Sequence, residues 1–367
     1  MFFMFISAIL SPVSWADARF ARATTEASLR TSGEQPLVRG ALELQSNQYV
    51  SSGQPYFRDE AAQNNTSLIL DLNDERAVGS GWDAAIRARD EYSFSENWNY
   101  LNVHDLYVSR GPAWTRLSLG RRHYDWAQWE STWNSGVFQP RYMQNRLHPE
   151  SAGLTGVFGD LRSGPWRLTV GLLALHIPEI GPHCYVDEDQ LVSHNLWFHP
   201  PASRFNMGGE EGEIRYSLNK PRSSEVLSNP GSVAKLEFQA GGVLSRLSYA
   251  YKPVPQFALG FPSDQRVNLL SNDVFMDVEV NARLLYHHVI NWDQGIQVSE
   301  WNLVGSVGYE RPQEDPGPDN WTAQQFAPTW ISSLEVSRPL EEEGPSAARV
   351  RLGVLRVQGG DAPDTGT

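Results

Sequence analysis

The stretch "FMDVEVNARLLY", Phe275 to Tyr286, alternates regularly between two kinds of side chain. From Met276 to Tyr286 every second residue is apolar or aromatic, and polar residues such as Asp277 and Arg283 lie between them. Successive side chains of a β-strand point to opposite faces of its sheet. The pattern therefore predicts a strand with one apolar face and one polar face.

The same alternation recurs along most of the chain, between clusters of glycine, proline, asparagine and aspartate that are typical of turns. Several of these segments are about ten residues long, which is the length that a tilted strand needs to cross a bilayer. Beyond the N-terminus, no segment of useful length has the period of an amphipathic helix. The sequence predicts an all-β fold with strands at residues 38–48, 66–73, 82–92, 100–109, 113–122, 152–160, 165–176, 211–219, 232–241, 243–251, 274–291, 295–309, 328–338 and 346–357.

The connections between these predicted strands differ in length. Short turns are predicted at residues 109–113, 161–165 and 291–295, and long connections at 49–65, 123–151, 177–210, 252–273 and 310–327. Short turns at one end of a sheet and long loops at the other are typical of transmembrane β-barrels. A soluble β-sandwich is the alternative, because alternation alone does not distinguish a face in lipid from a face in a protein core.

The composition agrees with strands that have one apolar and one polar face, and it argues against several other classes of protein. Mean hydropathy is low, at −0.43, yet the chain has 13 Trp, 13 Tyr and 15 Phe. A formal net charge of −13 argues against nucleic acid as a partner, because nucleic acids bind basic surfaces. The one cysteine, Cys184, excludes an intrachain disulfide.

With long strands, an apolar face that often ends in Trp or Tyr, and this alternation of connections, the chain resembles Gram-negative outer-membrane β-barrels, porin-like in plan. The resemblance implies an antiparallel transmembrane β-barrel of about fourteen or more strands in the bacterial outer membrane. It implies passive diffusion of small polar or anionic solutes without a cofactor, contact with outer-membrane lipid and lipopolysaccharide, and a shape that allows a homo-oligomer. The alternatives are a substrate-specific polysaccharide channel or exporter, and a non-conducting surface adhesin or structural barrel.

The two ends of the chain carry their own expectations. Phe2 to Leu10 is an apolar run, and Ser14-Trp15-Ala16 has the small-x-small pattern of a cleavage site, which predicts a signal peptide at residues 1–16 and a barrel at 17–367. A buried N-terminal strand is the alternative. The last predicted strand runs toward the long loops, so we expect the barrel to be truncated or open at the C-terminus, because an unpaired strand edge in lipid is costly.

Counting strand directions from the two ends gives conflicting results between residues 177 and 231. The long connections fall on the same side of the membrane only if one strand in that region is hidden or wrongly assigned. The sequence leaves this conflict open.

Alternation along the predicted strands turns a row of arginines toward the lumen. They create a field that favours anionic or hydroxyl-rich solutes, unless cross-strand ion pairs compensate them and merely stiffen the wall. The predicted pore-lining residues are Arg87, Arg89, Arg116, Arg122, Arg167, Arg215, Arg246, Arg283, Glu300, Arg349 and Arg351.

The connection at residues 120–150, "GRRHYDWAQWESTWNSGVFQPRYMQNRLHPE", is too aromatic for a bare surface loop. In a porin-like barrel it would fold against the inner wall and narrow the pore, with tryptophan faces available to a sugar. Plain loop packing and an exposed receptor surface are the alternatives. The predicted constriction residues are Arg121, Asp125, Trp126, Trp129, Trp133 and Arg141.

The remaining motifs carry little chemistry. The stretch "HCYVDEDQLVSHNLWFH", 183–199, mixes histidine, cysteine and carboxylates, but its spacing matches no zinc site, so no metal is expected. No nucleophile elbow, metalloprotease helix motif or phosphate-binding loop is present. The chain is therefore expected not to be an enzyme.

Overall fold

A single 15-stranded sheet, the main sheet, dominates the molecule. The computed structural model describes residues 3–5, 19–29, 38–48, 64–77, 81–94, 97–144, 149–193, 195, 198, 200–207, 209–268, 273–313, 326–339 and 349–359. Each pairing within the main sheet is antiparallel. The prediction of an all-β antiparallel fold is confirmed.

Strands that are neighbours in the main sheet follow one another in the sequence, apart from the elements inserted in the long connections. At one edge, the short β1 (Phe3–Phe5) pairs with β24. The long strands, in chain order, are β2 (Arg19–Leu29), β3 (Val38–Gln48), β4 (Asn64–Ala77), β5 (Trp82–Ser93), β6 (Trp98–Arg110), β7 (Thr115–Arg122), β10 (Leu154–Ser163), β11 (Trp166–Leu175), β16 (Gly231–Ala240), β17 (Val243–Pro253), β21 (Tyr286–Val298), β22 (Trp301–Pro312), β23 (Thr329–Pro339) and β24 (Arg349–Gly359).

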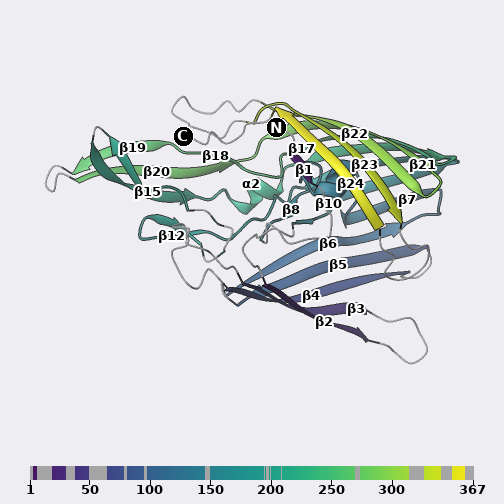
Figure 1. Ribbon diagram of the computed structural model, residues 1–367, viewed down its shortest axis with the longest axis horizontal. Coiled ribbons are helices and arrows are strands. Elements are labelled where there is room, and N and C mark those ends of the chain that lie inside the picture. Colours follow the sequence, from purple (N-terminus) through teal and green to yellow (C-terminus); the bar gives the residue numbers. More distant parts are fainter. Residues whose placement is uncertain are drawn as a thin grey trace.

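The main sheet has two chemically different faces. On the outer face, apolar side chains such as Leu119, Leu172 and Leu352 are exposed. On the inner face, many of the alternate residues are polar and buried, as Asp160 and Asp293 illustrate, and others are buried apolar residues such as Phe158. Figure 1 shows the sheet curving between β2, at the bottom of the view, and β24, at the top.

Antiparallel order places alternate connections at the same end of the main sheet. The connections at 123–153, 176–230, 254–285 and 313–328 lie at one end, the long-connection end. The turns at 111–114, 164–165, 241–242 and 299–300 lie at the other, the short-turn end. This is the asymmetry that the sequence predicts.

Two predicted barrel strands are not part of the main sheet, which corrects the sequence-based assignment. Segments 211–219 and 274–283 correspond to β15 (Glu210–Asn219) and β20 (Asp273–Arg283), which pair with each other in parallel. They form a second sheet with β14 (Arg204–Met207), β18 (Ala258–Gly260) and β19 (Ser263–Asn268). Their apolar residues, Ile214, Tyr216, Val278 and Val280, form a core of their own. Removing 211–219 from the strand count resolves the conflict in strand direction.

Three further boundaries differ from the prediction. The predicted strand 274–291 is two strands, since β20 ends at Arg283 and β21 begins at Tyr286. The predicted strand 295–309 spans the turn between β21 and β22, where Ser299 has a φ of 56°. The predicted turn at 291–295 lies inside β21, because its Asn and Asp residues face a polar inner surface rather than solvent.

Little of the predicted signal peptide lies within the described residues. Only Phe3–Phe5 of residues 1–16 are described, and they pair with β24 as β1. Strand β2 was not predicted from the sequence. The signal peptide and the incomplete C-terminus stay predictions.

The helical elements are short. They are α1 (Gln128–Trp133), in the connection between β7 and β10, and α2 (Ser223–Leu227), in the connection before β16. No helix in the described ranges is long and apolar enough to span a membrane.

Candidate functional site

Residues 123–144 and 149–153, the covering segment, cross the inner face of the main sheet. Trp126, Trp129 and Phe138 of this segment are fully buried. They pack against wall residues that include Phe158 of β10 and Val233 of β16. The largest apolar cluster among the described residues therefore lies between the covering segment and the inner face.

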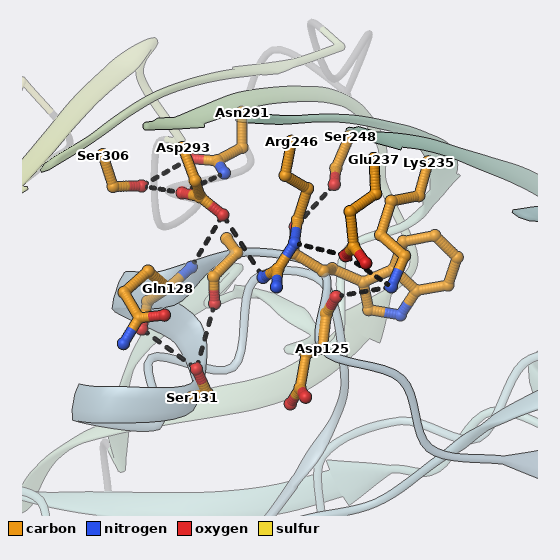
Figure 2. Close-up of polar contacts among 12 residues, drawn as sticks. Asp125, Gln128, Ser131, Lys235, Glu237, Arg246, Ser248, Asn291, Asp293 and Ser306 are labelled. Atoms are coloured by element: carbon orange, nitrogen blue, oxygen red, sulfur yellow. Dashed lines mark hydrogen bonds and ion pairs between the residues drawn. The ribbon is translucent and has the colours of Figure 1, made fainter. Parts of the chain in front are cut away.

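Polar contacts join the covering segment to one strand after another. The Lys235 ammonium of β16 donates to the Asp125 carbonyl at 3.0 Å, and the Ser248 hydroxyl of β17 donates to the Trp126 carbonyl at 2.5 Å. On β21, Asn291 accepts a hydrogen bond from the indole N–H of Trp129 at 2.6 Å. Figure 2 shows this row of wall side chains facing the covering segment.

Helix α1 contacts the wall through its first backbone N–H group and through two polar side chains. The backbone N–H of Gln128 donates to Asp293 at 3.1 Å, where the carboxylate meets the positive end of the helix. Farther along the wall, Glu335 of β23 accepts from the Thr132 hydroxyl at 2.7 Å and from the Gln128 amide at 3.2 Å. These contacts fix the helix across β21 and β23.

Two inner-face glycines leave room for the tryptophans of α1. A Cβ on Gly308 of β22 would lie 3.1 Å from the Trp129 ring, and one on Gly353 of β24 would lie 2.9 Å from the Trp133 ring. Since real side chains rarely pack that closely, larger residues at these positions would displace the helix. The wall is therefore shaped to fit the covering segment.

Glu130 stabilises the covering segment from within. Its carboxylate, which is buried, accepts hydrogen bonds from the Ser135 hydroxyl at 2.6 Å and from the backbone N–H groups of Val137 and Gln139 at 3.2 and 3.0 Å. Burial outweighs these bonds and raises the pKa of Glu130. The loop after α1 is thus folded around one buried carboxyl group.

The C-terminal end of the covering segment is held by β5 and β6. Glu150 lies 2.7 Å from the Arg89 guanidinium and accepts from the Asn102 amide at 3.1 Å. His104 contacts Glu150 at 3.2 Å and the Ser151 carbonyl at 2.7 Å. Burial opposes ionisation of Glu150, but its hydrogen bond with His104 and the charge of Arg89 lower its pKa overall.

The arginines predicted to line a pore are paired with carboxylates. Seven of the eleven predicted residues lie on the inner face of the main sheet and form ion pairs there. They are therefore not a row of arginines whose charge is uncompensated. The pairs are Arg87 with Asp105, Arg89 with Asp71 and Glu150, Arg116 with Asp83, Arg122 and Arg167 with Asp160, Arg246 with Glu237 and Asp293, and Arg351 with Glu335.

Three of the predicted pore-lining residues are not on the inner wall, and a fourth is not described. Arg215 and Arg283 belong to β15 and β20 of the second sheet, so their assignment to the lumen is wrong. Glu300 is in the turn between β21 and β22, half-exposed and paired with Arg338. The side chain of Arg349 lies outside the described residues.

The predicted constriction residues have different surroundings. Trp126 and Trp129 are buried on all sides, so their ring faces are not available to a sugar. Trp133 packs on Gly353, and Asp125 is the most exposed of the set, with 63% of its side chain accessible. These positions fit packing of the loop better than solute stacking.

The two predicted arginines of this set act at its ends. Arg121 alternates onto the face of Leu119, away from the inner face, and its Nε donates to the Gly153 carbonyl at 3.0 Å. Arg141 pairs with Glu179, in the connection after β11, at 2.8 Å. Arg141 also donates to the Asn134 carbonyl within the segment, at 3.3 Å, so both residues position the segment.

Sequence reasoning missed the wall residues that hold the covering segment. Asp293 and Asn291 were assigned to a turn, and Asp160 to the last position of a predicted strand. Asp160 forms ion pairs with Arg122 and Arg167. It also accepts hydrogen bonds from the hydroxyls of Thr169 and Tyr124. The alternation of Ile290 and Trp292 with Asn291 and Asp293 in "HHVINWDQG" was the signal that could have identified β21.

Within the described residues, no group of three or more histidine, cysteine or carboxylate side chains is arranged to hold a metal ion. Of the histidine-rich stretch 183–199, His194 and His199 lie outside the described residues. Cys184 is half-buried, which raises the pKa of its thiol.

The chain matches no protein-family model and no curated relative. Among solved structures it is similar to OmpT, an outer membrane protein of Vibrio cholerae, at 8% identity and a TM-score of 0.34, over 96% of this chain and 100% of that one. It is also similar to OmpF of Salmonella typhi in complex with daunomycin, at 10% identity and a TM-score of 0.32, over 88% and 96% of the two chains.

A third similar structure is a porin refined at 1.8 Å resolution, at 10% identity and a TM-score of 0.27, over 80% of this chain and 93% of that one. At such identities and TM-scores, these structures assign no role to any residue here. The role of the protein has to follow from its own surfaces.

Proposed function

We propose that this protein is a porin-like channel of the bacterial outer membrane, with the main sheet as its membrane wall. The observation that carries the proposal is the contrast between the two faces of that sheet. Leucine, valine and isoleucine side chains stand exposed along the outer face, where water would disfavour them, whereas ion-paired and hydrogen-bonded residues fill the inner face. Lipid outside and a polar interior account for both faces.

Aromatic residues at the two ends of the strands support a membrane position. At the short-turn end, Trp82, Trp166 and Trp301 are exposed, and at the long-connection end Trp330 packs on Tyr309 with ring centroids 4.6 Å apart. Residues 301–309 of β22 have the length of about nine to eleven residues that a tilted strand needs to cross the bilayer. Tryptophan and tyrosine at both limits match the interfaces of a bilayer.

The inner face supports passive passage of small polar solutes, beside the covering segment. The exposed polar side chains near this segment include Asp125 of the segment and Arg87 of β5, which is 45% exposed. Because the inner arginines are paired, their fields largely cancel within a few ångströms. We therefore expect weak ion selectivity, and neither catalysis nor a cofactor is part of the proposal.

The test is the conductance of the protein, extracted in native form from outer membranes, in a planar bilayer under a salt gradient. We expect stable channels with a reversal potential near zero. Strong anion preference would mean that unpaired arginines dominate the passage. Channels that only an anionic polysaccharide blocks would favour the substrate-specific alternative. Folded protein that forms no channels would refute the proposal and leave a surface-binding or structural role.

A further inference from the structure

A separate two-stranded hairpin with an unusual turn lies against the second sheet. Strands β12 (Tyr185–Asp187) and β13 (Gln190–Val192) pair across the two-residue turn Glu188–Asp189. Both turn residues have positive φ, 46° and 61°. Such turns normally use glycine or asparagine, since a side chain disfavours this conformation. Strained non-glycine residues of this kind gather at functional sites.

Contacts to β15 hold the strained turn in place. The backbone N–H of Tyr216 donates to the Asp189 carbonyl at 2.7 Å, and the Gln190 amide donates to the Ile214 carbonyl at 2.7 Å. The Tyr216 hydroxyl donates in turn to the Ala202 carbonyl at 2.7 Å. The hairpin and β15 therefore form one fixed unit.

A pocket of about 420 Å³ lies between the hairpin and β15. Small-molecule sites usually measure about 300–1,000 Å³. Tyr185 contributes aromatic surface, the edge of the buried Tyr216 closes one side, and the polar lining comes from Asp189, Ser217 and Lys220. The Tyr185 ring is itself supported by His183, with ring centroids 6.1 Å apart and planes 30° apart.

The chemistry of this lining selects a neutral, hydroxyl-rich ligand. One carboxylate and one ammonium, from Asp189 and Lys220, leave the pocket without net formal charge. A carboxylate accepts from hydroxyl groups, an ammonium donates to them, and the Ser217 hydroxyl does both. Aromatic rings offer a flat apolar surface for the C–H face of a sugar.

We propose that this pocket binds a neutral pyranose, with Asp189 as its principal acceptor of hydroxyl hydrogen bonds. The turn places Asp189 in the lining of the pocket while its backbone carbonyl is bonded to β15. The site belongs to the second sheet, which extends beyond the long-connection end of the main sheet (Figure 1). It is independent of whether the main sheet conducts solutes.

The experiment is saturation-transfer NMR on the full chain, folded in lauryldimethylamine oxide, a detergent without sugar groups. The probes are the methyl glycosides of glucose, galactose and mannose, each as the pyranoside. We expect saturation of the ring protons of at least one probe. If none of them is saturated, or if glycylglycine binds where no pyranoside does, the proposal is wrong.

Matched variants assign the signal to the pocket. Asp189→Asn, which suits the turn at least as well, should weaken binding tenfold or more, whereas Asp187→Asn, on the same hairpin but outside the pocket lining, should not. Lys220→Gln provides a second variant away from the turn and should weaken binding several-fold. Equal affinity of wild type, Asp189→Asn and Lys220→Gln would place the sugar elsewhere and overturn the proposal.

Two glycine variants distinguish the effect of the strained turn on stability from the effect of the Asp189 carboxylate on sugar binding. Glu188→Gly should raise the unfolding temperature and leave binding unchanged, since Glu188 does not line the pocket. Asp189→Gly should raise the unfolding temperature equally but abolish binding. Retained binding in Asp189→Gly would show that the carboxylate is not the acceptor.

Discussion

The inner face of the main sheet has two regions, the covered wall and the charged wall, whose inward side chains find their partners in different ways. From β10 to β24 the wall is covered. Some of its inward residues contact the covering segment, as Gly308, Ser248 and Asn291 do, and others pair with one another beneath it, as Arg246 and Glu237 do. On β5 and β6 the inward residues are long and charged, such as Arg87 and Asp105, which pair with each other at 3.0 Å.

The difference shows how one strand pattern serves two purposes. Where another part of the chain packs on the wall, inward residues such as Ser248 and Asn291 are matched to partners from the covering segment. Where the wall faces space, charged side chains satisfy one another across the strands and remain partly in water. Substitutions on the covered wall should therefore affect stability and pore size, and substitutions on the charged wall should mainly affect ion preference.

The largest effect is expected from Trp129→Ala. The side chain is fully buried and its indole N–H is bonded to Asn291. Its loss should cost about 3–5 kcal/mol in the free energy that docks the covering segment. Urea unfolding in lipid vesicles measures the loss, and single-channel conductance should increase as the segment loosens. Trp330→Ala is the control, since Trp330 is 55% exposed on the outer face. Equal effects of both variants would contradict the covered-wall description.

A smaller cost is expected when the wall, rather than the segment, is changed. Gly308→Val places side-chain atoms where the Trp129 ring lies 3.1 Å from the ideal Cβ, and should cost about 1–3 kcal/mol. Gly305→Val is the matched control on the same strand, because its Cβ would meet only Leu334, at 4.0 Å. Both are measured by urea unfolding. A Gly305→Val variant as unstable as Gly308→Val would mean that β22 simply tolerates no branched residue.

The sequence shows the outer face of these walls far better than the inner one. Alternation alone predicts Leu119 and Leu172 as apolar outer residues, because a strand in lipid repeats one chemistry at every second position. The bond between Trp129 and Asn291 joins residues 162 positions apart, and no local pattern predicts such a partner. Alternation also fails to separate Val278, in the core of the second sheet, from residues that face lipid.

Two carboxyl groups of the covering segment, the buried Glu130 and the partly buried Glu150, should respond to pH in opposite ways. The pKa of Glu130 is raised above its ordinary 4.5, mainly by burial. As pH rises from 4.5 through the pKa of the folded state, the unfolded chain ionises first and stability falls. Acidification from neutral pH toward 4.5 should therefore stabilise the wild type. Glu130→Gln should remove this gain, with a change of about 1 kcal/mol or less at its acidic limit.

Glu150, held by the charged wall, gives the contrasting case. Burial opposes its ionisation, but the bond with His104 and the charge of Arg89 lower its pKa below the ordinary 4.5. Its contribution is present above pH 4.5 and is lost as pH falls through the pKa of the folded state. Unfolding temperatures between about pH 3 and pH 8 test both groups. Glu150→Gln should flatten only the acidic limb, and a shared effect of the two variants would contradict opposite shifts.

The smallest change in stability is expected from Arg87→Gln, on the charged wall. Arg87 is 45% exposed, so its pair with Asp105 should contribute only about 0.2–1 kcal/mol. The same substitution leaves Asp105 without its cation and should shift the reversal potential toward cation preference. Arg110→Gln is the control, because Arg110 is exposed at the rim and stacks over Trp82 at 5.2 Å. If Arg87→Gln destabilises the protein as strongly as Gly308→Val and leaves the reversal potential unchanged, the charged wall has the same packing role as the covered one.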